Sequence, residues 1–527
     1  MNSIKESSDL ESISAVINQN SYDQETGVRR GLKTRHISLI AISGIIGPGI
    51  LIGAGITLKT GGPLSLLLSV IVIALVALSV MNSLGEMLAI YPNGGGFISI
   101  VKKFHSMPLA AVIGYSYLIV WFCVLANEYN TLSSIFNLWD PQGKVPSYGY
   151  ILLFWVGFQA FQMIGVEAFG EAEYWLAWVK ILGLLAYYVF SVVYISGGIK
   201  GRPAIGFHYW KESATIGGFG GFLKNLVFMS TFFSGIESIS ATSNETKNPS
   251  VAIPKAIRLT IIRIVFIYFF VALFYGVTVS PLDPRLTSSS KSLKAPIAIA
   301  IQNAGWNQGI QLVNAFILVT CLSAVNSSIY IGSRTLLNLS HEGLAPAFVQ
   351  LKTESGVPWV SVTIVNLLGL ISIMNVKTGA QDAFSYIVNI SGVSVFIVWG
   401  IISFINLRIR KAWAMQGFPL EQLPYRSKFF PWATYFGLFF NVLFLLIQGW
   451  DVFKPFDVKT FVDCYVLIPF SGVLYVVIGL LKGFRLAKLQ SIDLQDGMRE
   501  DLEKVVVVDS NEKGQRSTGQ SWWTYVI

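Results

Sequence analysis

The chain has 527 residues, of which 53% are hydrophobic and only 13% are charged, and its formal net charge is +9. A soluble domain carries about a quarter charged residues because its surface faces water, so this composition excludes an ordinary soluble protein. The excess of basic residues does not indicate nucleic-acid binding, because no basic face with interleaved aromatic residues occurs in the sequence. Most of the surface is therefore expected to face a lipid bilayer.

The two ends of the chain differ from its middle in composition. The first 36 residues are polar and of mixed charge, which predicts a cytoplasmic tail over 1–36 rather than a cleavable signal peptide. The transmembrane domain is predicted over 37–482 and a cytoplasmic C-terminal tail over 483–527. Residues 1–36 and 489–527 are short of branched apolar residues, which predicts disordered or regulatory segments open to trafficking or ubiquitin-ligase adaptors.

Twelve segments of the middle region are long and apolar enough to cross a bilayer, which takes about 20 residues. Eight of them are free of charge: 37–58, 64–85, 148–166, 309–333, 357–376, 383–407, 429–450 and 464–481. Four carry ionisable residues: 108–136 with Glu128, 175–199 with Lys180, 222–244 with Glu237 and 259–281 with Arg263. An even number of spans puts both tails on one side. The excess of Lys and Arg beside the spans favours the cytoplasmic side.

The first span contains a run of helix-breaking residues, because residues 43–49 read Ser-Gly-Ile-Ile-Gly-Pro-Gly. Proline lacks a backbone N–H, and glycine loses more backbone entropy in a helix than other residues do. Unwound backbone at membrane depth is tolerated only where it lines a cavity or meets a ligand. The alternative is a kinked helix in which small residues allow close packing against its neighbours.

The sixth span repeats this pattern, with Ser234 and Gly235 followed by the carboxylate of Glu237. Two broken spans five helices apart fit two inverted five-helix repeats of the LeuT type. The predicted fold is therefore all-α, with twelve transmembrane helices arranged as repeats over 37–199 and 222–407, plus two extra helices over 429–482. In this architecture half-helix N-termini face an anionic group and freed carbonyls face a cation, and an amino acid presents both.

Each ionisable residue inside a span needs a partner, a water path or a function, because a mid-membrane charge costs about 2.5–3.5 kcal/mol. Lys180 lies about six residues, or roughly 9 Å, inside the fifth span, and could instead extend to the cytoplasmic surface. Glu237 is either a proton carrier or a structural carboxylate that binds freed backbone N–H groups. Glu128 lies nearer the outer end of its span, where it either tunes the preferred substrate charge or extends outward.

Several ordered motifs resemble those of one known family over about residues 30–485. The motifs are Ser43 to Gly55, the Phe-Ser-Gly-Ile-Glu run at 233–237, Asn244 to Pro249 with Pro254, Asn326-Ser327 with Tyr330 and Ser333-Arg334, Glu342 to Pro346, and Asn389 with Ser391-Gly392, Trp399, Arg408 and Arg410. Their order and spacing resemble the fungal amino-acid permeases of the amino acid–polyamine–organocation superfamily, and among them the yeast low-affinity general permeases.

This resemblance implies a substrate site at the two broken spans. The implied carboxylate contacts are N–H groups from Gly47 through Gly49 to Ile50. The implied ammonium contacts are carbonyls near Ser43–Gly44 and Phe232–Ser234, with Gly235 at the break. Pro48 departs from the family pattern, because relatives often have Ser or Thr there, and this removes one N–H and one hydroxyl.

The resemblance also implies a gate and a coupling residue. Phe232 or Phe233 would close over the substrate, although simple packing is the alternative for both rings. Lys180 resembles the lysine that takes the place of a bound sodium ion in related proton-coupled transporters.

The sequence thus predicts a permease that carries amino acids into the cell with protons, by alternating access, with Lys180 or Glu237 releasing the proton. The plasma membrane is the expected location, with a vacuolar or endosomal membrane as the alternative. A polyamine or sulfonium permease and a non-transporting sensor remain open. No cofactor, metal or nucleic acid is expected, and no carboxylate pair, nucleophile elbow or phosphate loop indicates an enzyme.

Overall fold

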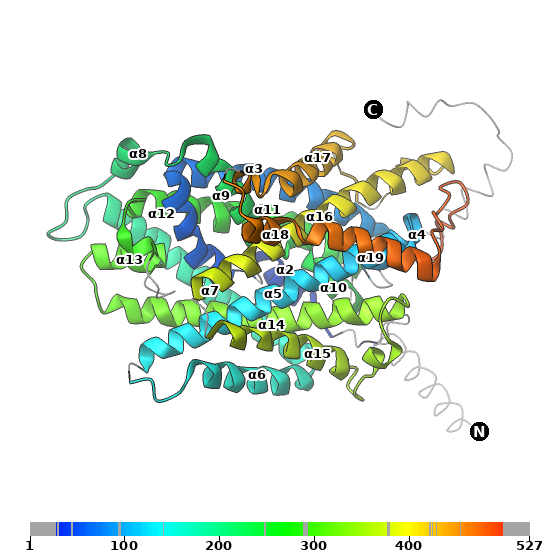
Figure 1. The fold of residues 1–527 in the computed structure, drawn as a ribbon, viewed down its shortest axis with the longest axis horizontal. Coiled ribbons are helices and arrows are strands. Elements are labelled where there is room, and N and C mark those ends of the chain that lie inside the picture. Colours follow the sequence, from blue (N-terminus) through cyan, green and yellow to red (C-terminus); the bar gives the residue numbers. More distant parts are fainter. Residues whose placement is uncertain are drawn as a thin grey trace, which may run out of the picture.

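The computed structural model describes residues 28, 31–43, 46–92, 96–140, 142–246, 249–287, 294–376, 380–420, 423, 425–427, 429–453 and 455–498. Helix is the dominant secondary structure of this part of the chain, and its β structure is limited to two isolated bridges, Leu32 with Thr246 and Phe453 with Phe456. The long helices run roughly along the long axis of the molecule (Figure 1). The predicted all-α fold is confirmed.

The helices of the first half are α2 (Thr34–Ser43), η1 (Gly49–Gly53), α3 (Ala54–Ile90), α4 (Phe97–Phe104), α5 (Met107–Trp139), α6 (Ser147–Ile164), α7 (Val166–Ile195) and α8 (His208–Ser213). The next are α9 (Gly218–Phe233), η2 (Ile236–Ser238), α10 (Ile239–Thr242), η3 (Ser243–Glu245), α11 (Pro249–Arg263), η4 (Ile264–Phe269), α12 (Phe270–Thr278), η5 (Pro284–Thr287) and α13 (Pro296–Asn303). The last are α14 (Gly309–His341), η6 (Ala347–Gln350), α15 (Trp359–Gly369), η7 (Leu370–Val376), α16 (Ala380–Met415), α17 (Trp432–Ile447), η9 (Trp450–Val452), α18 (Val458–Tyr465) and α19 (Leu467–Lys482).

Within the described residues, seven helices are long and apolar enough to cross a membrane, or eight if the bent pair α18 and α19 forms one span. Several predicted spans are divided among shorter helices, so the number twelve stays a prediction. The first predicted span runs through α2, η1 and the start of α3. Helix α3 then bends at Gly62, which has a φ of 80° and precedes Pro63. Beyond the bend, the helix continues as the second predicted span.

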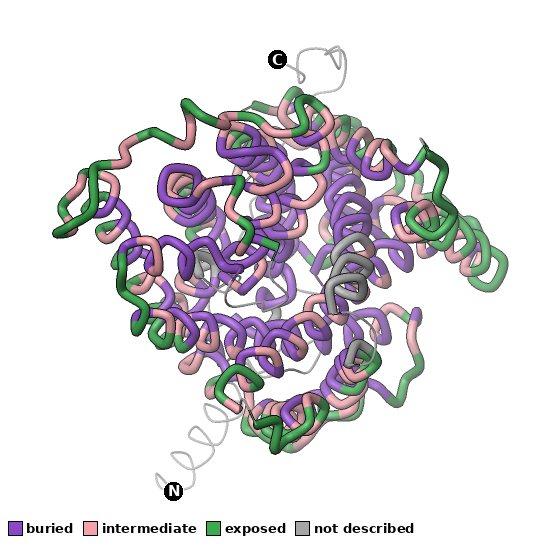
Figure 2. The backbone as a smooth tube through the Cα atoms, turned by 60° about the vertical axis from the view of Figure 1, so that its left-hand side comes forward, coloured by how far each residue is buried: buried purple, intermediate pink, exposed green. Residues whose placement is uncertain are grey.

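Burial separates the central helices from the peripheral ones (Figure 2). In α5, 72% of the most apolar window is buried, and this helix packs against α14, α16, α4, α6 and α19. In α7 and α17 the buried share is 33%. Large apolar side chains point outward from the peripheral helices, among them Leu153, Val156, Trp175, Leu182, Val189, Phe439, Leu446, Val473 and Leu480. An exposed apolar surface of this extent is that of a protein solvated by lipid.

The two ends of the helix bundle carry different connections (Figure 1). Helices α8 and α13 lie at one end, and α4 lies at the other together with residues 483–498, here called the C-terminal strap. Part of the strap was expected to be disordered, but Leu494 and Met498 are 2% and 5% exposed. The Tyr91 hydroxyl donates to the Leu494 carbonyl at 2.9 Å, and the Gln416 amide donates to two strap carbonyls. These hydrogen bonds replace the helical ones that the strap lacks.

Candidate functional site

The break predicted in the sixth span is present. Helix α9 ends at Phe233, and Ser234 then leaves the helical conformation with φ −50° and ψ 139°. Gly235 follows with φ 91°, a left-handed conformation that side chains other than glycine's disfavour, and a short 3₁₀ turn begins at Ile236. The polar backbone of residues 234–235 is thereby released from the helical hydrogen-bond pattern in the middle of an apolar segment.

The first span is interrupted as well. Helix α2 ends at Ser43, whose side chain lies outside the described part, as does the whole of Gly44. Gly47 is not helical, and helix resumes at Gly49 with Pro48 as its N-cap. The N–H groups of Gly49 and Ile50 belong to the first turn, where backbone donors have no partner in their own helix.

The two breaks meet at Phe232, because α9 packs against η1. A Cβ atom on Gly49 would lie 2.9 Å from Cδ1 of Phe232, and one on Gly53 would overlap the tip of the same ring. Both glycines therefore allow the ring to lie directly on the backbone of η1. The neighbouring Phe233 is fully buried and stacks on Tyr268 with ring centroids 3.9 Å apart. Of the two rings, Phe232 contacts the predicted site and Phe233 packs in the core.

A small cavity lies against this segment, and its lining comes from three parts of the chain. The lining residues are Pro48, Gly49, Ile52, Gly53, Ile56, Asn127, Thr131 and Lys294. Spans one and three thus supply most of the wall, and the connection before α13 supplies Lys294. Nothing in the local sequence shows that the loop that carries Lys294 folds back onto the first span.

The predicted coupling residue Lys180 is completely buried on α7, so it does not extend to the membrane surface. Its ammonium donates to the Ser323 hydroxyl of α14 at 2.6 Å, and that hydroxyl donates to Glu173 at 2.5 Å. Asn326 donates to the other oxygen of Glu173 at 2.7 Å, and Gln162 donates to Asn326 at 2.8 Å. Sequence reasoning missed Glu173, although its spacing of seven residues from Lys180 puts both on one face of a helix.

The carboxylate of Glu237 has partners at the break itself. The backbone N–H of Gly235 donates to one of its oxygens at 3.1 Å, and Trp399 Nε1 donates to the other at 3.0 Å. These contacts correspond to the structural alternative for Glu237. The adjacent Ser234 hydroxyl is buried and has no hydrogen-bond partner among the described residues. A buried hydroxyl in this position costs free energy unless a ligand or water binds it.

Glu128 is buried on α5, with 3% of its surface exposed, and therefore does not extend outward. Its neighbours Asn127 and Thr131 line the cavity, whereas Glu128 is not among the lining residues. The structure thus brings Gly49 and Phe232 together, whereas Glu128 is not among the residues that line the cavity.

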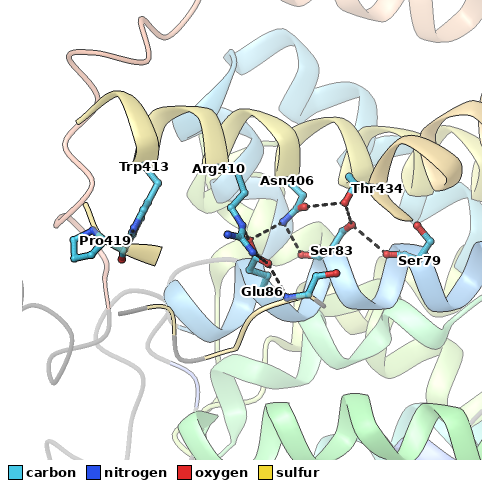
Figure 3. Close-up of polar contacts among 9 residues, drawn as sticks. Ser79, Ser83, Glu86, Asn406, Arg410, Trp413, Pro419 and Thr434 are labelled. Atoms are coloured by element: carbon cyan, nitrogen blue, oxygen red, sulfur yellow. Dashed lines mark hydrogen bonds and ion pairs between the residues drawn. The ribbon is translucent and has the colours of Figure 1, made fainter. Parts of the chain in front are cut away.

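A buried ion pair joins α3 and α16 just beyond the second and tenth predicted spans (Figure 3). Arg410 on α16 donates through Nη2 to Glu86 on α3 at 2.9 Å, and its Nε also contacts this carboxylate. The backbone N–H of Ser427 donates to Glu86 at 3.2 Å, and Asn406 links the pair to Thr434. Neither member of the pair lies in an apolar run, and nothing in the local sequence indicates that the two pair.

A second buried ion pair joins the segment after the sixth span to α14. Arg334 donates to Glu245 at 2.9 Å, and the Tyr330 hydroxyl donates to the same carboxylate at 2.5 Å. The backbone N–H of Leu32 donates to the Glu245 carbonyl at 2.9 Å, and this bond attaches the segment just before α2 to Glu245. Phe169 of α7 stacks on Tyr330 at 3.9 Å. Four distant segments thus meet around Glu245, through its carboxylate, its backbone carbonyl and the ring of Tyr330.

The chain shares its fold with a solved transporter. Its structure superposes on that of Mhp1, a nucleobase-cation-symport-1 family transporter, with a TM-score of 0.51 and 15% sequence identity, over 92% of this chain and 99% of the other. At this identity the likeness concerns the fold alone. It agrees with the prediction of a LeuT-type arrangement made from the two broken spans.

The sequence comparisons are more specific. The family of amino acid permeases matches residues 36–491. The general amino acid permease AGP3 of Saccharomyces cerevisiae is 56% identical over 92% of this chain and 87% of its own length. An uncharacterized amino-acid permease of Schizosaccharomyces pombe is 43% identical over 90% and 88%, and the basic amino-acid permease of S. cerevisiae is 34% identical over 93% and 88%. The chain, a multi-pass membrane protein, therefore belongs to the amino acid permease family.

Proposed function

We propose that this permease carries amino acids into the cell together with protons, and that the substrate binds between the two broken spans. The observation that carries the proposal is the contact of Phe232 with Gly49 and Gly53 beside a cavity. Midplane binding between a first and a sixth discontinuous helix is the arrangement expected of inverted-repeat transporters. Both tails are proposed to be cytoplasmic and the location to be the plasma membrane.

Recognition of the substrate backbone is proposed at both breaks. The N–H groups of Gly49 and Ile50 would bind the carboxylate, and the Ser234 hydroxyl would bind a polar group of the substrate backbone. The carbonyl of Phe232 already accepts a hydrogen bond of 2.7 Å from Tyr268, so it has one free lone pair at most for the ammonium. Phe232 is the proposed gate, because its ring covers the η1 backbone.

Proton coupling is proposed at Lys180. Its hydrogen bond to Ser323, which in turn donates to Glu173, gives a buried proton-binding group a direct link between α7 and α14. Loss or gain of one proton in such a network changes the charge balance between two helices that have to move apart or together. Glu237 is satisfied by Gly235 and Trp399, so it is assigned to holding the break rather than to releasing a proton.

The observed lining does not favour the rival polyamine permease. A carrier of polycations needs carboxylates at its site, and the lining of the cavity, as far as the chain is described, includes none. No observation on the described residues favours the sensor alternative.

Uptake of labelled amino acids into membrane vesicles, with and without a protonophore, tests the proposal. Uptake should follow an imposed inward proton gradient and fall when the protonophore collapses it. Gly49→Leu should block uptake because its side chain would fill the space of Phe232, and Lys180→Ala should remove the proton dependence. Uptake unaffected by the protonophore would refute proton coupling, and normal uptake by Gly49→Leu would show that the substrate binds elsewhere.

A further inference from the structure

The hydroxyl of Ser323 lies between two groups that can each carry a proton. Its oxygen accepts a hydrogen bond of 2.6 Å from the Lys180 ammonium, and its own hydrogen is donated to Glu173 at 2.5 Å. A hydroxyl has one donor and two acceptor sites, so it makes both contacts in the directions open to it. Lys180 and Ser323 have no exposed surface, and Glu173 is 1% exposed. A continuous hydrogen-bonded path therefore runs from a buried base to a buried acid across two helices.

The other oxygen of Glu173 has a partner whose orientation is fixed. The Asn326 amide nitrogen donates to it at 2.7 Å. The Asn326 amide oxygen in turn accepts a hydrogen bond of 2.8 Å from Gln162, so the amide cannot be reversed without loss of both bonds. Glu173 therefore keeps one hydrogen bond on each oxygen, through Ser323 and Asn326, and this arrangement stabilises the carboxylate when it is anionic.

Transfer of one proton along this path removes two buried charges. An N–H bond of Lys180 breaks as an O–H bond forms on Ser323, while the original O–H bond of Ser323 breaks as an O–H bond forms on Glu173. The lysine is left as a neutral amine and the glutamate as a neutral acid. Both hydrogen bonds reverse direction, and no heavy atom has to change place. Because isolated charges are costly in an apolar interior, the neutral pair can compete with the ionic one.

Other ionisable groups also face Lys180. Arg263 of α11, Glu128 of α5 and the Cys321 thiol of α14 act on it electrostatically. Their fields influence the position of the proton, but proton transfer itself takes place between groups within hydrogen-bond reach. The path given by the printed contacts leads from Lys180 through Ser323 to Glu173.

The path also has a direction along α7. Glu173 lies seven positions, or about 10 Å, nearer than Lys180 to the end of the helix at Val166. In the orientation proposed above, with both tails in the cytoplasm, this end faces the cytoplasm. A proton that moves from Lys180 to Glu173 therefore moves inward.

We propose that Ser323 is a proton relay, which passes the coupling proton from Lys180 to Glu173, and that Glu173 releases it on the cytoplasmic side. The inference rests on the proposed proton-coupled uptake and adds two residues to it. Release leaves Lys180 neutral and Glu173 anionic, and Lys180 takes up the next proton when the site faces outward again. The alternative is that Ser323 only bridges two charges and so holds α7 on α14.

Net uptake and exchange separate a relay from a structural bridge. Net uptake into proteoliposomes, driven by an inward proton gradient, requires each carrier to release its proton inside. Exchange of labelled for unlabelled amino acid at equal pH does not, because the carrier returns with proton and substrate bound. Ser323→Ala should therefore lower net uptake about tenfold or more and leave exchange near the wild-type rate.

Two further variants keep both hydrogen bonds and differ only in the relay. Ser323→Thr retains a hydroxyl and should keep both net uptake and exchange. Ser323→Asn can accept from Lys180 through its amide oxygen and donate to Glu173 through its amide nitrogen, but an amide does not pass a proton on. It should exchange substrate and lose net uptake. This pair of variants tests the relay even if Ser323→Ala does not fold.

The control is Ser328→Ala, at another buried serine of α14, whose hydroxyl donates to the Ala324 carbonyl of its own helix at 2.7 Å. It should change neither rate, and the amount of protein in the membrane is measured for every variant. Equal net uptake by Ser323→Asn and Ser323→Thr would overturn the relay. A parallel loss of net uptake and exchange in Ser323→Ala and Ser323→Asn would overturn it as well, because it would show a structural bridge.

These outcomes are distinct from failure of the function on which the inference rests. A wild-type chain whose uptake ignores the proton gradient would remove the proposed coupling, and the relay with it. A wild-type chain with proton-driven uptake, together with unchanged net uptake by Ser323→Ala, would refute the relay alone.

Discussion

The ammonium of Lys180 and the carboxylate of Glu173 meet at the same hydroxyl, that of Ser323. The two charged residues lie seven positions, or about two turns, apart on α7, and the hydroxyl comes from α14. A single serine thereby links a buried acid and a buried base across two helices. Removal of either charge should therefore change both the stability of the fold and the binding of a proton.

Glu173→Gln should abolish the proton dependence of uptake and lower its rate by about tenfold or more, because glutamine cannot exchange a proton with Lys180. It should also destabilise the protein, since removing one partner of a buried charge pair costs about 3–5 kcal/mol. Uptake against external pH, with and without a protonophore, measures the first effect and thermal unfolding in detergent measures the second. The double variant Glu173→Gln with Lys180→Gln should regain stability without regaining proton dependence. Uptake by Glu173→Gln that still follows the proton gradient would show that coupling lies elsewhere.

Gly53→Ala should strongly reduce uptake, because the added methyl group overlaps the ring of Phe232. Overpacking of this kind costs about 1–3 kcal/mol and displaces the ring from the break. The matched control is Gly157→Ala on α6, where a Cβ atom would meet nothing within 4 Å. Adding Phe232→Ala to Gly53→Ala should relieve the overlap and restore folding. Equal uptake by Gly53→Ala and Gly157→Ala would contradict the close approach of α9 to η1.

Arg410→Met should destabilise the protein by about 3–5 kcal/mol, because it leaves the Glu86 carboxylate buried without its cation. The comparison is Lys102→Met, which breaks the more exposed pair of Lys102 with Glu342 and should cost at most about 1 kcal/mol. Thermal unfolding of the detergent-solubilised proteins measures both. Similar shifts for the two variants would mean that the pair between α3 and α16 contributes no more than a surface contact.

Removal of the C-terminal strap should destabilise the end of the bundle where it packs. A chain ending at Lys482 should melt at a lower temperature than one ending at Met498, because it loses the buried Leu494 and the hydrogen bond from Tyr91. Leu494→Asp in the full chain should reproduce the effect, whereas Leu486→Asp, at a side chain that is 60% exposed, should not. If both truncations melt together, the strap contributes nothing to stability.

The sequence by itself determined the class of protein, the apolar helices and the places where two of them break. These properties are local, because the length of an apolar run, a Gly-Pro-Gly sequence and a Ser-Gly pair each act through the backbone of their own segment. The order of the family motifs added amino acids as the substrate class. The position of Lys180 within an apolar segment was also sufficient to single it out.

Only the tertiary structure decided which side chains face one another. The sequence does not single out Glu173, because a carboxylate near the end of a span is common. Its role is apparent only from its contact with Ser323 of α14. Phe232 and Phe233 are equivalent in sequence, yet one turns toward η1 and the other stacks on Tyr268. The cavity brings together residues 48, 131 and 294, and such long-range contacts depend on how helices pack rather than on any local pattern. That is the physical reason why the composition and motifs indicated an amino-acid permease, while the contact of Phe232 with η1 became visible only in the folded chain.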